Sequence, residues 1–277
     1  FYSGAQDTPE AKYAFIISVD GLRPDAIKED SAPNLWNLIK NGSYTGYART
    51  VNRPKTIPAH VALVTGLSYE THGVHTNKYT EDMGFVKHDT VFRIAKENGL
   101  SAAMVTGKKK LTFLADPKNL DFVDITDYEE DSTSVVKNGA LSYIETAEPG
   151  IALIHFPEPD ISGHATVWMS SQYMDAVSKV DAAVGEILKA LNDKGIYAES
   201  VIFITSDHGG SGNTHGEGVP LSYDIPWLAA GHNIKSGFVI EDPVRIQDTA
   251  PTLLKALGLE HPEHMDGRVV EEIFIKD

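Results

Sequence analysis

The chain contains no cysteine, and this absence removes several kinds of structure and chemistry from consideration. Disulfide bridges, zinc sites with thiolate ligands and catalysis by a thiol are all excluded. Long apolar runs are missing as well, because no stretch of the sequence reaches the length of a membrane span. The lack of cysteine leaves the cell compartment undecided.

Basic residues are scarce relative to acidic ones. The sequence has 24 Lys and Arg against 39 Asp and Glu, a formal net charge of −15. A nucleic-acid scaffold normally presents a basic surface, so the charge disfavours that class. A nucleotide remains possible as a small substrate, because bound divalent cations would supply local positive charge. The sequence predicts nothing about oligomeric state.

Apolar strand-like runs alternate with helical patterns along the chain. With 277 residues and 42% hydrophobic content, the chain can bury a sizeable core. The alternation predicts an α/β fold with a mostly parallel central sheet and helices on both faces. We expect a single domain, residues 1–277, with a small inserted cap around residues 76–131. The predicted strands are Tyr13–Val19, Ala102–Thr106, Ile151–Phe156 and Val201–Thr205, and the predicted helices are Ala32–Lys40, Thr90–Asn98, Ser132–Thr146, Ser170–Asn192 and Ala250–Leu257.

Thr56 stands where an extended basic segment, Arg49 to Lys55, passes into a helical pattern. It therefore resembles a helix N-cap, with Pro58 tolerated in the first turn. A hydroxyl there would lie beside free backbone N–H groups and the positive end of the helix dipole, which suits an anionic phosphoryl group. Taken alone, the same pattern also fits a threonine that only caps a helix.

Acidic and imidazole side chains follow three of the predicted strands. Asp20 closes the first apolar run, Asp160 and His164 follow the third, and Asp207 and His208 close the fourth. Residues just beyond the carboxyl ends of parallel strands converge on one crevice. We therefore expect three Asp and two His side chains to meet at one edge of the sheet.

This donor set predicts a site for two divalent metal ions. Mixed carboxylate and imidazole ligation suits zinc first, and manganese or iron second. If each metal is held by three side chains besides the nucleophile, six ligands are needed, and the three Asp and two His supply five. A sixth protein ligand is therefore required. His215 is the nearest candidate.

Several motifs, taken in order and spacing, resemble the alkaline phosphatase superfamily, and within it the type I phosphodiesterase and nucleotide pyrophosphatase family. The similarity runs from about Phe15 to the end of the chain. The matching stretches are Ser18-Val19-Asp20-Gly21-Leu22-Arg23, Lys55-Thr56-Ile57-Pro58-Ala59-His60, Thr65-Gly66 with His72-Gly73-Val74 and Asn77, Asp160-Ile161-Ser162-Gly163-His164, Ser206-Asp207-His208-Gly209, and His215-Gly216 leading into Asp224-Ile225-Pro226.

The resemblance implies how the ligands are divided. His215 follows His208 by only seven residues, whereas longer family members place this histidine far downstream. Compact relatives show the short spacing, and the motif context favours His215 over His232, His261 or His264. By resemblance, one metal would be held by Asp20, Thr56, Asp207 and His208, and the other by Asp160, His164 and His215.

The predicted activity is hydrolysis of phosphodiesters or nucleotide pyrophosphates. Two cations about 4 Å apart favour in-line displacement by Thr56, giving a phospho-threonine intermediate. A phosphomonoesterase or a phosphonate hydrolase with the same metal core is the alternative. A non-catalytic binding module is a third possibility, although the full ligand set argues against it.

Substrate contacts are predicted for few residues. Asn77 matches the family's asparagine and would donate its amide to a phosphoryl oxygen, although a plain turn residue is the alternative. Tyr79, soon after it, is a candidate wall for a nucleobase. Lys108 to Lys110 follow a predicted strand. We interpret them as a solvated turn, with recognition of a substrate phosphate or carboxylate as the alternative.

The chain begins at Phe1 rather than Met, with a polar leader and no signal peptide. Because many relatives in that family are exported, this start predicts a mature extracytoplasmic or secreted protein, or else a trimmed chain.

Overall fold

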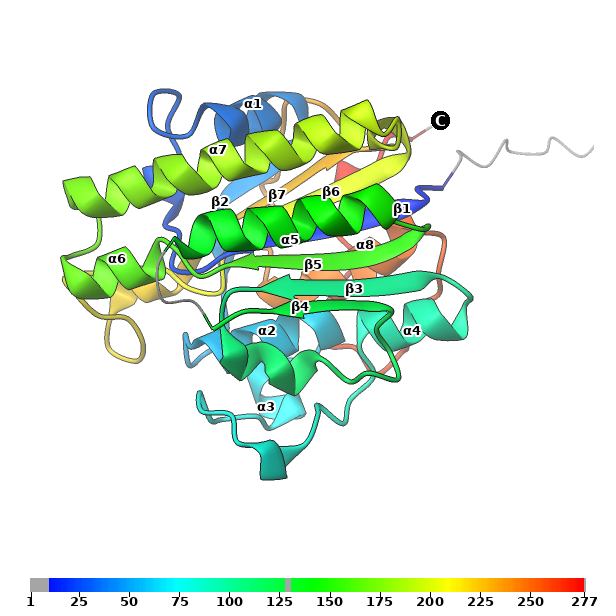
Figure 1. Cartoon of the computed structure of the whole chain (residues 1–277), viewed down its shortest axis with the longest axis horizontal. Coiled ribbons are helices and arrows are strands. Elements are labelled where there is room, and N and C mark those ends of the chain that lie inside the picture. The colour runs from blue at the N-terminus through cyan, green and yellow to red at the C-terminus, as the bar shows by residue number, and fades with distance from the viewer. Residues whose placement is uncertain (1–9, 128–130, 277) are drawn as a thin grey trace, which may run out of the picture.

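One eight-stranded sheet organises the chain (Figure 1). The computed structural model describes residues 10–127 and 131–276. The strand order is β4-β3-β5-β1-β6-β7-β2-β8. The strands are β1 Tyr13–Val19, β2 Ser43–Arg49, β3 Ser101–Thr106, β4 Phe122–Ile125, β5 Gly150–Phe156, β6 Ser200–Thr205, β7 Asp224–Gly231 and β8 Phe238–Val239.

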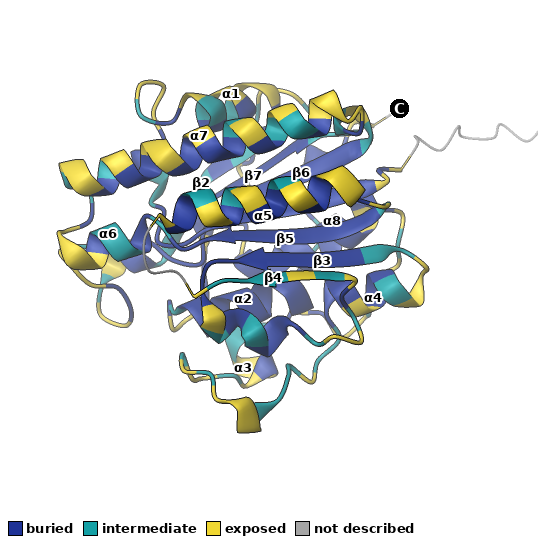
Figure 2. Ribbon diagram, in the orientation of Figure 1, coloured by how far each residue is buried: buried dark blue, intermediate teal, exposed yellow. Residues whose placement is uncertain are grey.

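The middle of the sheet is parallel and completely buried. β1 pairs in parallel with β5 on one side and β6 on the other, and every residue of these three strands is buried (Figure 2). Strands covered on both faces need apolar side chains in both directions, which explains their continuous apolar runs. β7 runs antiparallel between β6 and β2, so the sheet is mixed on that side.

Helices cover both faces of the sheet, which confirms the predicted fold class (Figure 1). α1, α5 and α7 pack on one face, and α2, α4 and α8 pack on the other. Both ends of each of the five predicted helices lie within one residue of the observed ends. The helices are α1 Pro33–Asn41, α2 Thr56–Thr65, α3 Tyr69–His72, α4 Val91–Glu97, α5 Ser132–Thr146, α6 Asp160–Ala165, α7 Ser171–Asp193 and α8 Thr249–Ala256.

Part of the segment 76–131 belongs to the main sheet. It contributes β3 and β4, and it also carries α4 and the short 3-10 helices η2 (Glu81–Met83) and η3 (Lys109–Leu114). The division into a single domain with a small cap stays a prediction.

The topology collects the ends of four parallel strands at one edge. β3, β5, β1 and β6 are neighbours, and their carboxyl ends lead into Lys108, Asp160, Asp20 and Asp207 respectively. Strand order alone thus gathers side chains that lie far apart in the sequence. The candidate site is built at this edge.

The polar leader on which the predicted export rests lies in residues 1–9, outside the described residues. Within residues 10–127 and 131–276, no helix combines the length and the apolar character needed to cross a membrane.

A buried carboxylate on α7 caps the start of α1. Asp181 is 1% exposed, and its two oxygens accept the backbone N–H groups of Asn34 (3.1 Å) and Leu35 (2.7 Å). These are donors that the first turn of a helix cannot pair internally. Asp181 therefore joins two helices on the same face of the sheet.

Replacing Asp181 by Ala should destabilise the protein by about 2–4 kcal/mol, because the buried N–H of Leu35 and the part-buried N–H of Asn34 lose their acceptor. Urea unfolding followed by circular dichroism measures the change. Asp193→Ala on the same helix is the matched control, since its ion pair with Lys189 is exposed and should contribute within about 0.5 kcal/mol. Similar losses in the two variants would contradict the capping role of Asp181.

Candidate active site

The sequence predicts Thr56 as the N-cap of a helix. In the structure Thr56 is instead the first residue of α2. The cap position belongs to Lys55, whose backbone is extended and whose carbonyl accepts the N–H of Ala59. The prediction was wrong by one residue because cap and first-turn positions are not separated by local pattern. The Thr56 hydroxyl is not bound to its own helix, and it accepts a hydrogen bond from the Lys110 ammonium at 3.2 Å.

Neighbouring side chains hold the backbone around Thr56. His60 donates from Nδ1 to the Thr56 carbonyl (2.8 Å), and its Nε2 accepts from the Ser18 hydroxyl (2.8 Å). Burial, followed by the charge of His155, lowers the pKa of His60 to about 4, so the ring is neutral near pH 7. The side-chain oxygen of Asn77 accepts the N–H of Ile57 at 2.9 Å. Asn77 thus reaches the start of α2 beside the hydroxyl.

Three buried carboxylates, Asp20, Asp160 and Asp207, meet at the edge of the sheet, and we call them the carboxylate cluster. His208 lies among them, with its Nε2 3.4 Å from Asp20 Oδ1, 3.9 Å from Asp160 Oδ1 and 3.4 Å from Asp207 Oδ2. Each of these four atoms is buried and has no hydrogen-bond partner among residues 10–127 and 131–276. Four ligands bound tetrahedrally to zinc at about 2.0–2.1 Å lie about 3.4 Å apart. The spacing therefore suits a cation between them.

A second group of donors shares Asp160. Its Oδ1 lies 3.4 Å from His164 Nε2 and 3.7 Å from His215 Nε2. The rings of His208 and His215 stack with centroids 3.6 Å apart. Burial and then His208 lower the pKa of His215 to about 3, which keeps its ring neutral. Of the histidines considered for this position, His215 is the one that the fold brings to the cluster.

The tautomers of these histidines favour metal binding. In each ring Nδ1 contacts a backbone carbonyl oxygen, which can only accept, so Nδ1 carries the hydrogen and Nε2 keeps its lone pair in the neutral ring. Such carbonyl contacts are the usual support of a metal-bound histidine. The pairs are His164 with Asn213 (2.9 Å), His208 with Gly209 (3.0 Å) and His215 with Pro54 (2.9 Å).

Lys108 lies inside the site, so its interpretation as part of a solvated turn was wrong. Its ammonium donates to Asp20 Oδ2 (2.6 Å) and Asp160 Oδ2 (2.7 Å), and the residue is 8% exposed. Lys109, by contrast, is exposed. Sequence pattern could not separate the two residues, because only the arrangement of β3, β5 and β1 places the acceptors around Lys108.

Electrostatics around the cluster are dominated by burial and Lys108. Burial alone would raise the pKa of Asp20, but Lys108 and a hydrogen bond from His155 hold it well below its usual range. The pKa of Asp207 is shifted the other way, because burial and then the negative charge of Asp20 raise it. A cation bound among these groups would relieve this repulsion.

His155 is a positioning residue that the sequence reasoning missed. Its Nε2 donates to Asp20 Oδ2 (3.1 Å), and its Nδ1 accepts from the Thr106 hydroxyl (2.9 Å). Both ring nitrogens are therefore occupied, which separates His155 from the candidate ligands. A polar residue within the otherwise apolar run of β5 was the one available signal.

A cavity of about 800 Å³ adjoins the candidate site. Lys108, Lys110 and Tyr79 contribute to its wall. Tyr79 is half-buried, with its ring centroid 6.4 Å from that of Phe113. Tyr79, predicted to face the substrate, thus lies beside the same lysines that contact Thr56 and the carboxylate cluster.

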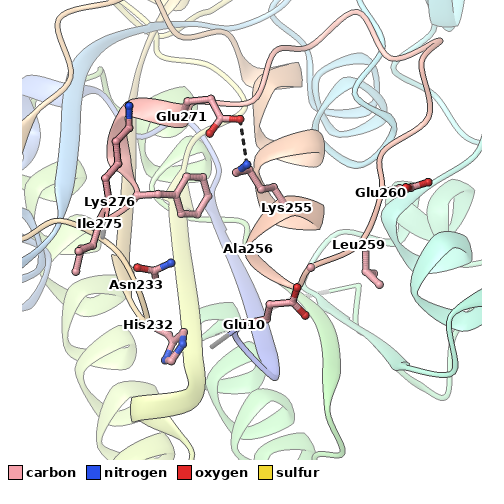
Figure 3. A pocket seen from close by; sticks show the side chains of 12 residues that line it. Glu10, His232, Asn233, Lys255, Ala256, Leu259, Glu260, Glu271, Ile275 and Lys276 are labelled. Atoms are coloured by element: carbon pink, nitrogen blue, oxygen red, sulfur yellow. Dashed lines mark ion pairs between the residues drawn. The ribbon is translucent and has the colours of Figure 1, made fainter. Parts of the chain in front are cut away.

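Another cavity, of about 440 Å³, lies at the opposite edge of the sheet (Figure 3). It is bordered by Glu10, just before β1, and by His232, just after the antiparallel β7. An ion pair between Lys255 and Glu271 (3.2 Å) crosses its upper wall. Neither candidate group of metal donors reaches this cavity, so the active site is assigned to the other edge.

The fold is α/β, and two groups of candidate metal donors lie at one edge of its sheet. A family profile described as "Type I phosphodiesterase / nucleotide pyrophosphatase" matches residues 14–222. The chain therefore belongs to the type I phosphodiesterase/nucleotide pyrophosphatase family, as the motifs indicate.

The chain is similar to relatives whose names describe different activities. It is 27% identical to a bis(5'-adenosyl)-triphosphatase of Mus musculus, covering 75% of this chain and 49% of the relative. It is 25% identical to a 2,3-bisphosphoglycerate-independent phosphoglycerate mutase of Staphylococcus epidermidis, covering 87% of this chain and 48% of the relative. The chain thus spans about half the length of these relatives.

Solved structures share the fold. Murine ectonucleotide pyrophosphatase/phosphodiesterase 5, as an inactive variant in complex with AMP, superposes with a TM-score of 0.79 at 16% identity, covering 96% of this chain and 100% of that one. Phosphonate monoester hydrolase of Agrobacterium radiobacter gives a TM-score of 0.74 at 16% identity, covering 95% and 77%. At these identities the likeness concerns the fold alone.

Replacing Lys108 by Met should lower the melting temperature of the metal-free protein by roughly 6–20 °C. Removing one partner of a buried ion pair costs about 3–5 kcal/mol, and each kcal/mol shifts the melting temperature by roughly 2–4 °C in a domain of this size. Differential scanning calorimetry after chelation measures the shift.

Lys109→Met is the matched control, because it removes the neighbouring exposed lysine. Added Zn²⁺ should raise the melting temperature of the Lys108→Met variant more than that of the unaltered protein, since the cation replaces the lost positive charge. Equal melting temperatures of the two variants without metal would show that Lys108 does not hold the carboxylates together.

Proposed function

We propose that the protein is a metal-dependent hydrolase of phosphoric esters, of the phosphodiesterase/nucleotide pyrophosphatase type, acting through a phospho-threonine intermediate on Thr56. The observation that carries this proposal is the position of the Thr56 hydroxyl. It lies at the start of α2, unused by its own helix, and Lys110 joins it to the loop whose Lys108 binds the carboxylate cluster.

Two divalent cations, with zinc the first choice, fit the residues present. The four unpartnered buried atoms and the free Nε2 atoms of the histidines support this assignment. When bound, such a pair of cations lowers the pKa of a hydroxyl and neutralises charge on a phosphoryl group. The proposed ligands are Asp20, Thr56, Asp207 and His208 for one cation, and Asp160, His164 and His215 for the other.

The chain's own residues would orient the reaction. Thr56 Oγ1 attacks phosphorus at the start of α2, where the positive end of the helix dipole favours an anionic group. Asn77 uses its oxygen to accept from Ile57, which leaves its amide N–H groups to donate to a phosphoryl oxygen. His60 fixes the backbone of the nucleophile, and His155 fixes Asp20. Positioning of this kind supplies most of the rate in phosphoryl transfer.

Nucleotides are the proposed substrate class. The adenosine compound in the printed name of the mouse relative and the AMP complex of the murine structure support this choice. The cavity beside Tyr79 has room for a leaving group with a base that stacks on the ring. Phosphonate hydrolysis remains the alternative for the same core.

An extracytoplasmic location is proposed with the function. It is supported by the family relatives whose printed names describe ectonucleotide pyrophosphatase/phosphodiesterases, such as the human family member 1.

Thr56→Ala should lower kcat by at least about 1,000-fold on bis-(p-nitrophenyl) phosphate, because the attacking oxygen is removed. Thr56→Ser keeps a hydroxyl and is the matched control, which should retain measurable turnover. Acid-quenched protein should carry phosphate on the peptide containing Thr56, as detected by mass spectrometry. Chelation should abolish turnover, and zinc should restore it.

Two outcomes would contradict the proposal. Unchanged turnover in Thr56→Ala would exclude Thr56 as nucleophile. A metal-loaded, unaltered protein that binds nucleotides without any turnover would be a binding module instead.

A further inference from the structure

Lys110 places a positive charge directly on the nucleophile. It lies in η3, just after β3, and its ammonium is 3.2 Å from Thr56 Oγ1. Within residues 10–127 and 131–276 it forms no ion pair with a carboxylate, and the bond to Thr56 is its one hydrogen bond. A half-buried cation without a counter-ion, pointing at a reactive oxygen, indicates that an anion from outside the chain completes the contact.

Lys108 and Lys110 therefore differ in role although they lie two residues apart. Lys108 is neutralised by two of the protein's own carboxylates, Asp20 and Asp160. Lys110 has no such partner among the described residues. Its charge remains available for a substrate, and both lysines line the cavity of about 800 Å³ that a substrate would enter.

Counting charges shows what the additional cation can do. With two divalent cations bound, their four positive charges and that of Lys108 face the three negative charges of the carboxylate cluster and the ionised oxygen of Thr56. One positive charge therefore remains, which matches the single negative charge of a phosphodiester. Lys110 raises this to two, which matches the transferred group of a phosphomonoester above its second pKa of about 6.

Geometry brings Lys110 within reach of that group. A phosphorus atom ready for attack lies roughly 3–3.5 Å from the nucleophilic oxygen. Because Lys110 Nζ is 3.2 Å from the same oxygen, a non-bridging oxygen on the side of phosphorus that faces the ammonium can come within hydrogen-bonding distance of it. A charged donor in this position stabilises the second negative charge, which a diester lacks.

We infer that the site has a second activity, hydrolysis of phosphomonoesters, and that Lys110 is the residue that confers it by binding a non-bridging oxygen of the dianionic group. This inference rests on the proposed function, and it adds a substrate class to it.

The reaction balances as hydrolysis. The Thr56 oxygen, having lost its proton to solvent, forms a bond to phosphorus, and the bond from phosphorus to the ester oxygen breaks with its electron pair. The departing alkoxide takes a proton from water and leaves as the alcohol. A second water then cleaves the phospho-threonine, releasing inorganic phosphate and restoring the hydroxyl.

The test compares Lys110→Met with Lys109→Met in the zinc-loaded enzyme at pH 8. Lys109 is the matched control, because its side chain is exposed and makes no hydrogen bond or ion pair among the described residues. For p-nitrophenyl phosphate, kcat/KM should fall roughly 30- to 100-fold in Lys110→Met, the loss of one charged hydrogen bond. For bis-(p-nitrophenyl) phosphate it should fall less than about 5-fold.

Binding of inorganic phosphate, measured by isothermal titration calorimetry, gives a readout independent of turnover. Its Kd should rise at least about 10-fold in Lys110→Met and stay within about 2-fold in Lys109→Met. Lys110→Arg keeps the charge and should recover part of the monoester activity. Zinc content of all variants should be equal by elemental analysis.

Equal losses on monoester and diester would overturn the inference, because Lys110 would then act on Thr56 alone. Unchanged monoester activity in Lys110→Met would overturn it as well, as would an unaltered enzyme active on the diester but not on the monoester. If the unaltered enzyme hydrolyses neither substrate, the proposed function and the second activity both fail. Phosphate binding then still decides separately whether Lys110 contacts the anion.

Discussion

The contact on which the site depends is the buried ammonium of Lys108 between Asp20 and Asp160. Carboxylates that converge in a low-dielectric interior repel one another, and this repulsion must be offset for the edge of the sheet to keep its shape. Lys108 offsets it with a cation built into the chain. The remaining oxygens face inward without partners, so the same arrangement that needs a lysine for stability leaves a place for divalent metals.

The parallel part of the sheet provides the rigid framework that holds this arrangement in place. β1 is completely buried between β5 and β6, so the positions just after these strands are set by a rigid framework. Buried neighbours then orient the donors: His155 holds Asp20, and carbonyl groups from separate loops hold the imidazole rings. α2, which begins at Thr56, brings the hydroxyl of that residue to the site. Rigid strands and fixed tautomers together give a site that is ordered before any ligand binds.

The loop after β3 adjusts the chemistry without altering this framework. One of its lysines is held by the carboxylate cluster, the next is exposed, and Lys110 reaches the nucleophile. A change of Lys110 would therefore alter the charge presented to a substrate while Lys108 and the carboxylate cluster stay in place. The relatives of this chain include a triphosphatase and a mutase, so one framework serves several phosphoryl chemistries.

Local pattern in the sequence predicted the elements and most of the side chains that the fold gathers at the candidate site. The apolar run before Asp20 predicts a buried strand by itself, and α5 has the predicted bounds, because burial and periodicity are properties of neighbouring residues. The roles of Lys108 and His155 were decided only by tertiary structure. Lys108 lies 88 residues from Asp20 and 52 from Asp160, and no local pattern encodes a contact that depends on the order of β3, β5 and β1. The same reason applies to the histidines: the Nε2 atoms of His60 and His155 bond to Ser18 and Asp20, and these contacts between residues far apart in the sequence separate the two structural rings from the candidate metal ligands.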